Sequence, residues 1–232
     1  MPRWTGVRAA LTQLRAPART PIALYGYSGG SVPTGFGGAE LAPAYSPELN
    51  IIGAAAGGIP VDPAHNLGYI NGKPEWTGVI PALMAVYAET YDIDLAGYLS
   101  PKGERILRQV AGECIEQFAD EYPPGLTDRQ LLEPGGGRSA RRPRGGAAGD
   151  LEKRDGNARH AAGSMMLGVG NSDGIGDGVM VAADVAGLAR SYRSRGGVPT
   201  TFTEYRGQTH TAAFIPWSIE ALAFVNDRFA GR

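Results

Sequence analysis

The feature that most constrains the fold of this chain is an apolar run that passes directly into a glycine-rich turn around a serine. The run is Ile22–Tyr25, and the turn reads Gly26-Tyr27-Ser28-Gly29-Gly30. The run predicts a buried strand. The turn has the G-x-S-x-G pattern of a nucleophile elbow, in which a strand bends sharply into a helix and presents a serine hydroxyl above the sheet. The same residues also fit an ordinary glycine-rich turn between a strand and a helix.

The glycines that flank Ser28 have a predicted steric role. In an elbow the serine occupies a strained backbone conformation, and neighbouring elements pass close to the turn. We therefore expect a side chain at Gly26 or Gly30 to collide with the adjacent strand or helix.

Length and composition limit the class of protein. The 232 residues are 43% hydrophobic and 19% charged, with a formal net charge of -1. This composition suits one α/β domain with a substantial core. The near-neutral charge argues against nucleic acid or an anionic membrane surface as the main partner.

Cysteine content and hydrophobic segments set further limits. Cys114 is the single cysteine, so an internal disulfide is excluded. No apolar run is long enough to span a bilayer, and no stable membrane anchor is expected. The residues Met1–Gly6 contain no hydrophobic signal core.

Strand and helix patterns alternate along much of the chain. Besides the elbow strand, strands are predicted at Asn50–Ala56, Ser164–Gly170 and Thr200–Tyr205. Helices are predicted at about Val7–Leu14, from Ser28 through Leu41, at about Val179–Arg193 and around Ile219–Phe229. This order predicts the α/β class, with a doubly wound and mostly parallel sheet.

The middle of the chain, from Trp76 to Tyr122, has a helical pattern instead. Apolar residues recur at helical spacing in two stripes: Val79, Ile80, Leu83, Met84 and Tyr87, then Leu107, Val110, Cys114 and Phe118. Such stripes are usually core, and Cys114 is expected to be a small core residue. Between the second and third strands they are equally consistent with a helical cap over a site, assigned here to residues 71–134.

A segment from Gly135 to His160 stands apart in composition. It is rich in Arg, Gly, Ala and Pro, and Leu151 is its only large apolar side chain. Because it cannot bury enough surface to offset its ordering entropy, residues 135–163 are expected to be a disordered linker. The first part of the core (residues 1–70) and the cap would precede this linker, and the second part of the core (residues 164–232) would follow it. Its arginines could alternatively form an anion-binding patch.

The polar residues after the strands suggest nucleophilic catalysis. A nucleophilic serine needs a base to accept its proton and an acid to orient that base. In α/β-hydrolases these follow in the order Ser, Asp or Glu, His. Ser28, an Asp-rich loop after the third strand and His210 after the fourth satisfy this order at carboxyl ends of strands, where such sheets place their sites.

The sequence favours one histidine as the base, whereas it leaves two aspartates possible as the acid. Of the three histidines, His160 falls in the predicted linker and His65 in a loop on the side of the cap, so His210 is favoured as the base. Asp173 and Asp177 both lie in the loop after the third strand, and spacing leaves either able to reach His210.

Several motifs together resemble a known family. They are Leu24–Gly30, Glu40–Pro43, Gly53–Gly58, Gly176–Met180 and Thr209–Thr211. They are similar to the secretory lipase family, which includes the fungal lipase A enzymes and actinobacterial relatives, and the similarity covers most of Thr20–Pro134 and Ser164–Phe229. The segment between these two regions does not resemble the family, as a compensated frameshift in GC-rich coding sequence would produce.

The resemblance implies an α/β-hydrolase that cleaves carboxylic esters, triacylglycerols among them, beneath a helical lid. It implies Ser28 as nucleophile, Asp177 as acid and His210 as base, in an extracellular enzyme that needs neither a cofactor nor a metal. Gly29, the residue after the nucleophile, can supply one oxyanion N–H. Asp173 remains the alternative acid.

The chain also departs from the family. Family members are longer and have about half of the sheet upstream of the elbow, including the loop with the second oxyanion donor. Two other hypotheses therefore stand beside a lipase: a catalytically silent remnant that at most binds apolar ligands, and an acyltransferase or peptidase on the same fold.

Overall fold

The computed structural model describes residues 3–17, 19–115, 117, 122, 125–134 and 163–231. The chain divides into two compact units: Met1–Val61 with Arg154–Arg232, and Asp62–Lys153. The predicted linker, Gly135–His160, lies outside the described residues.

The first unit is built on a four-stranded parallel sheet in the order β1-β2-β3-β4. Its strands are β1 (Pro21–Tyr27), β2 (Asn50–Gly57), β3 (Ser164–Asn171) and β4 (Thr200–Arg206). Three of the four predicted strands are confirmed within one residue at their ends, and β1 continues two residues beyond the predicted run, to Tyr27. Parallel pairing places all four carboxyl ends at one edge of the sheet, where the loops that hold the polar residues begin.

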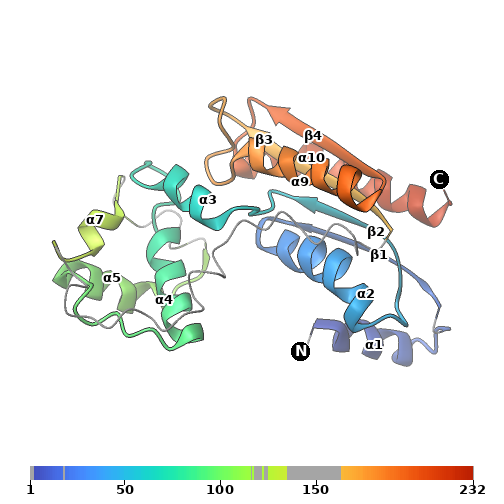
Figure 1. Ribbon diagram of the computed structural model, residues 1–232, viewed down its shortest axis with the longest axis horizontal. Coiled ribbons are helices and arrows are strands. Elements are labelled where there is room, and N and C mark those ends of the chain that lie inside the picture. Colours follow the sequence, from blue (N-terminus) through green and yellow to red (C-terminus); the bar gives the residue numbers. More distant parts are fainter. Residues whose placement is uncertain are drawn as a thin grey trace. The chain divides into compact units, whose positions relative to one another are not determined.

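Helices cover both faces of this sheet (Figure 1). On one face, α10 (His210–Phe229) lies so close to β2 that a Cβ at Gly57 would lie 2.5 Å from the Trp217 indole. On the other face lies the segment after the elbow, where a Cβ at Gly35 would lie 3.5 Å from that of Ala56. Tyr192 of α9 (Ala182–Gly196) donates a hydrogen bond to Glu40, which places α9 on this second face. The predicted doubly wound α/β fold is confirmed.

The predicted helix after Ser28 is present, but it is not a regular α-helix. A 3₁₀ turn, η1 (Ser28–Gly30), leads into a π-helix, η2 (Pro33–Leu41), and then into the short helix α2 (Ala42–Tyr45). Pro33 begins the π-helix, where a residue without an N–H is tolerated.

The first helix, α1 (Arg3–Gln13), packs on the outer end of the sheet. Its Val7 and Leu11 contact a buried cluster of Ala42, Leu49 and Ile51. The helix predicted at about Val7–Leu14 begins earlier, at Arg3, and ends at Gln13, so that Leu14 follows it and is 75% exposed.

Two further predictions about the first unit need correction. The elbow strand is only partly buried, with Tyr25 60% exposed, because β1 forms an edge of the described sheet and pairs there with β2. Helix α9 begins at Ala182 rather than at Val179. The amides of Val179 and Met180 instead donate to the Asp177 carboxylate, which holds this stretch as a turn.

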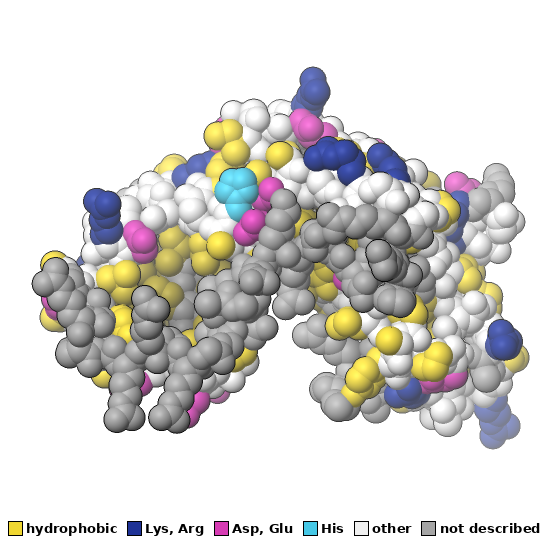
Figure 2. Space-filling view, in the orientation of Figure 1, with side chains coloured by type: hydrophobic (Ala, Val, Ile, Leu, Met, Phe, Trp, Pro, Cys, Tyr) yellow, Lys and Arg dark blue, Asp and Glu magenta, His cyan; other side chains and the backbone are white. Residues whose placement is uncertain are grey.

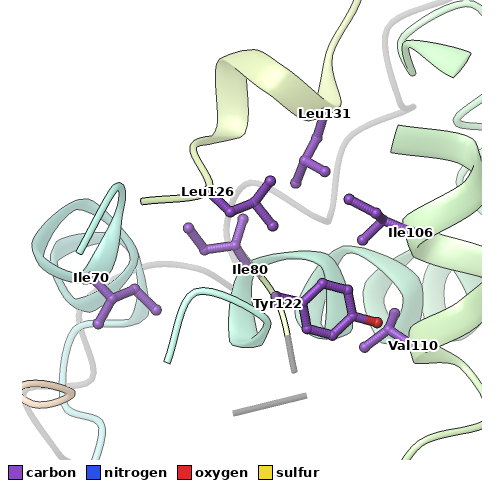
Figure 3. Close-up of a cluster of buried hydrophobic side chains, with 7 residues drawn as sticks. All are labelled: Ile70, Ile80, Ile106, Val110, Tyr122, Leu126 and Leu131. Atoms are coloured by element: carbon purple, nitrogen blue, oxygen red, sulfur yellow. The ribbon is translucent and has the colours of Figure 1, made fainter. Parts of the chain in front are cut away.

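The second unit is helical and has a core of its own. Its helices are α3 (Pro63–Ile70), α4 (Val79–Tyr91), α5 (Pro101–Val110) and α7 (Asp128–Leu131). Helices α3 and α5 each begin with a side-chain N-cap. Asp62 accepts a hydrogen bond from the His65 amide, and Ser100 accepts one from the Gly103 amide. Figure 3 shows the buried cluster that joins them: Ile70, Ile80, Ile106, Val110, Tyr122, Leu126 and Leu131.

This cluster accounts for part of the predicted apolar stripes. Ile80 and Val110 are buried in it, and Val79 and Met84 pack against it. Cys114 was expected in the core, and this is wrong: its side chain is exposed, because α5 ends at Val110. Phe118, the last residue of the predicted stripe, lies outside the described residues. In the described part of the chain, no helix combines the length and the apolar character needed to cross a membrane.

Candidate active site

Ser28 sits at the junction of a strand and a tight turn. Strand β1 ends at Tyr27 in extended conformation, and Ser28 itself has a positive φ of 52°. This left-handed conformation is uncommon for a residue other than glycine and is often found where a functional group must be presented. The Ser31 hydroxyl, which is fully buried, donates to the Ser28 carbonyl and closes the turn.

The two flanking glycines differ in their steric role. A Cβ at Gly26 would lie 2.2 Å from the Gly30 carbonyl oxygen and 2.6 Å from Thr34 Oγ1, so this position needs glycine. The corresponding prediction for Gly30 is wrong, because nothing lies within 4 Å of a Cβ there. Gly30 approaches Gly26 through its carbonyl group, whereas its own Cα–Cβ direction points into open space.

Asp177 is the acidic group that faces the site. It follows β3, is 1% exposed, and accepts hydrogen bonds on Oδ1 from the amides of Val179 at 2.9 Å and Met180 at 2.7 Å. Its other oxygen, Oδ2, lies 2.8 Å from His210 Nδ1. The two hydrogen bonds from backbone amides fix the orientation of the carboxylate, so that Oδ2 remains directed at the imidazole.

His210 connects Asp177 to Ser28. It is the first residue of α10, and its amide donates to the Asp177 carbonyl at 2.8 Å. The side chain is buried, and Nε2 lies 2.8 Å from Ser28 Oγ. The structure thus brings Ser28, His210 and Asp177 together in one hydrogen-bonded chain within the first unit.

The other residues named from the sequence occupy different places. Asp173 is exposed, and its Oδ1 accepts from the amides of Ile175 and Gly176 at 2.9 Å, which shapes the loop. His65 lies on α3 of the second unit, and His160 lies outside the described residues. Gly29 is exposed and follows Ser28 directly in η1.

Two further residues, Tyr27 and Gly58, lie against His210, and the sequence patterns do not predict either contact. The Tyr27 hydroxyl donates to the His210 carbonyl at 2.7 Å, and the two rings lie 5.3 Å apart between centroids. Gly58 has a positive φ of 55°, and a Cβ there would lie 2.7 Å from His210 Cε1. Tyr27 occupies a position that the G-x-S-x-G pattern leaves open, so the pattern gives no signal for it. In the sequence, Gly58 stands out only as the second glycine of the Gly57-Gly58 pair at the end of β2.

The arrangement suits proton transfer from a hydroxyl. A serine oxygen next to an imidazole nitrogen, with the opposite nitrogen held by a buried carboxylate, can pass its proton to the imidazole while it attacks an electrophile. Among the residues that the structure describes, no cluster of three or more His, Cys, Asp or Glu side chains could hold a metal ion.

Comparison with known proteins identifies similar sequences and folds. The family model for secretory lipases matches residues 4–128. Lipase A of Moesziomyces aphidis is 33% identical over 51% of this chain and 26% of its own length. Secreted triacylglycerol lipase LIP7 of Malassezia globosa is 30% identical over 90% of this chain and 44% of its own length.

Solved structures show the same fold. Candida antarctica lipase A in its closed state superposes with a TM-score of 0.77 at 24% identity, over 97% of this chain and 53% of that one. At this identity the likeness supports the fold alone. The chain spans 26% to 53% of the length of each of these three proteins.

Proposed function

The chain belongs to the secretory lipase family, and we propose that its site is that of a serine hydrolase acting on carboxylic esters, triacylglycerols among them. The observation that supports this most directly is the continuous chain from Ser28 Oγ through the His210 ring to the buried Asp177 carboxylate, with both contacts at 2.8 Å.

In the proposed reaction, Ser28 Oγ attacks the ester carbonyl carbon while His210 Nε2 takes the hydroxyl proton. Asp177 keeps the proton of the imidazole on Nδ1 and stabilises the imidazolium that forms. The Gly29 amide, the first after the nucleophile, is proposed as one donor to the oxyanion of the tetrahedral intermediate.

The second half of the cycle returns the proton. His210 protonates the leaving alcohol, the C–O bond of the ester breaks, and an acyl group remains on Ser28. Water then attacks the acyl-enzyme with His210 as base, which releases the carboxylic acid and restores the hydroxyl.

The substrate class and the cellular setting are proposed from the relatives. Several are named secreted triacylglycerol lipases, so we propose that this protein acts outside the cell on carboxylic esters such as triacylglycerols. We further propose that the helices within residues 71–134 serve as a cap. Their mixture of a buried cluster and half-buried apolar residues such as Leu83 is consistent with that role.

The test is ester hydrolysis with a serine variant and a matched control. The 232-residue chain and its Ser28→Ala and Ser194→Ala variants are assayed with a chromogenic short-chain ester and with a triacylglycerol emulsion. Ser194 is an exposed serine of α9. Ser28→Ala should lower turnover by about 10³-fold or more, and Ser194→Ala should leave it unchanged. Equal turnover by Ser28→Ala and the parent chain, or none by either, would contradict the proposal.

A further inference from the structure

We propose that Tyr27 is a positioning residue for His210, and that it fixes the backbone from which the imidazole reaches Ser28. The inference rests on the proposed function, because it concerns the same serine and histidine. Tyr27 has no place in the proton-transfer chain itself, and it acts through His210.

The hydrogen bond from Tyr27 completes the anchoring of His210 at both ends of the residue. On the amino side, the His210 amide donates to the Asp177 carbonyl at 2.8 Å. On the carboxyl side, the His210 carbonyl accepts from the Tyr27 hydroxyl at 2.7 Å. With these contacts and the one between Nδ1 and the Asp177 carboxylate, the main chain and the ring are held by separate partners.

Tyr27 is well placed to set the distance that matters. It immediately precedes Ser28 in the chain, so one residue is bonded covalently to the nucleophile and by hydrogen bond to the base. The rigid ring between these two attachments limits how far Ser28 Oγ and His210 Nε2 can separate from 2.8 Å. Proton transfer depends steeply on such a separation.

Packing around the tyrosine and the histidine removes the room for other positions. The Tyr27 ring lies 5.3 Å from the His210 ring and 5.0 Å from the Trp217 ring, measured between centroids. A Cβ at Gly58 would lie 2.7 Å from His210 Cε1 and 3.3 Å from Tyr27 Cζ. The backbone at Gly58 therefore closes the space beside the imidazole.

The hydroxyl also remains a donor under working conditions. Burial raises the pKa of Tyr27, and the nearby Asp177 carboxylate raises it further. The raised pKa means that the Tyr27 hydroxyl keeps its proton well above neutral pH and remains a hydrogen-bond donor.

The experiment measures the rate at which a fluorophosphonate probe labels Ser28 in the 232-residue chain. Tyr27→Phe retains the ring and removes the hydroxyl. Tyr205→Phe is the matched control, because Tyr205 is a buried tyrosine of the same side-chain cluster. We expect Tyr27→Phe to slow labelling by about 3- to 10-fold, the range for loss of one hydrogen bond. Turnover of a chromogenic ester should fall equally with little change in KM.

The final labelled fraction separates positioning from folding. A positioning role lowers the rate constant and leaves the final fraction of labelled protein equal to that of the parent chain, whereas misfolding lowers the fraction. Since the rate constant is obtained from the molecules that react, it remains informative if Tyr27→Phe folds incompletely.

Two other outcomes are possible, and they contradict different proposals. If the parent chain is labelled at Ser28 and Tyr27→Phe reacts at the same rate, or if Tyr205→Phe slows as much, the inference about Tyr27 is wrong and the proposed function stands. If the parent chain is not labelled at Ser28 at all, the proposed function fails and this inference fails with it.

Discussion

At the scale of single residues, the two oxygens of Asp177 have different partners, and this makes its replacement informative. Oδ1 accepts from two backbone amides, so an asparagine would keep its oxygen there and turn its NH₂ group toward His210 Nδ1. The imidazole would then carry its proton on Nε2, facing Ser28, and could not accept another.

We therefore expect Asp177→Asn to lower turnover of a chromogenic ester by about 10⁴-fold without unfolding the chain. Asp173→Asn is the matched control and should change turnover little, since Asp173 accepts from amides of its own loop. Both are measured as kcat on purified, folded protein. A larger loss for Asp173→Asn would assign the acid to that residue instead.

The glycines at the elbow give a second comparison of matched variants. Gly26→Ala places a methyl group 2.2 Å from a backbone oxygen and should destabilise the fold by about 1–3 kcal/mol or prevent folding. Gly30→Ala adds a methyl group in open space and should leave stability nearly unchanged. Chemical denaturation measures both, and equal losses at the two positions would contradict the geometry described for the elbow.

At the scale of secondary-structure elements, the buried contact between Tyr192 and Glu40 connects α9 to η2. The hydroxyl of Tyr192 donates to the Glu40 carboxylate, and both side chains are buried. Burial raises the pKa of Tyr192, and the charge of Glu40 raises it further. The tyrosine therefore remains a donor to the carboxylate.

Removing this donor should loosen the helices on that face of the sheet. Tyr192→Phe is expected to lower the free energy of unfolding by about 1–3 kcal/mol, because a charged acceptor loses a buried donor. Tyr45→Phe, at a tyrosine that is 52% exposed, should change it by less than about 0.5 kcal/mol. A Tyr192→Phe variant as stable as the parent would show that the contact contributes nothing measurable.

Elements were easier to predict from the sequence than their limits and surroundings. The strands were predictable because short apolar or alternating runs ended near glycines, and Ser28, an Asp-rich loop and His210 followed the strand ends in order. Asp177 was favoured over Asp173 only by the resemblance to the lipase family. The start of α9 was misplaced because two amides of its expected first turn are taken by the Asp177 carboxylate, a tertiary contact without local signal. The exposure of β1 depends on its neighbours in the sheet, which its own residues do not specify.

At the scale of the whole molecule, the exposed surface combines interspersed charged side chains with one apolar stripe that favours self-association. Basic and acidic side chains are interspersed on the face shown in Figure 2, in keeping with the formal net charge of -1. Helix α10, in contrast, carries exposed apolar side chains along one side at Ile215, Ile219, Leu222 and Phe229. Their spacing of four, three and seven residues places them on one side of the helix, with Asn226 between Leu222 and Phe229.

Such a stripe promotes self-association, because exposed apolar area is removed from water when two copies meet. The 232-residue chain should therefore show an apparent mass that rises with concentration in light scattering. Replacing Ile215 and Ile219, which are 63% and 67% exposed, by glutamate should shift it toward the monomer. Ser194→Asp with Gln13→Glu adds the same charge at exposed polar positions outside α10 and should have little effect. A parent chain that stays monomeric at about 100 µM would show that the stripe does not drive self-association.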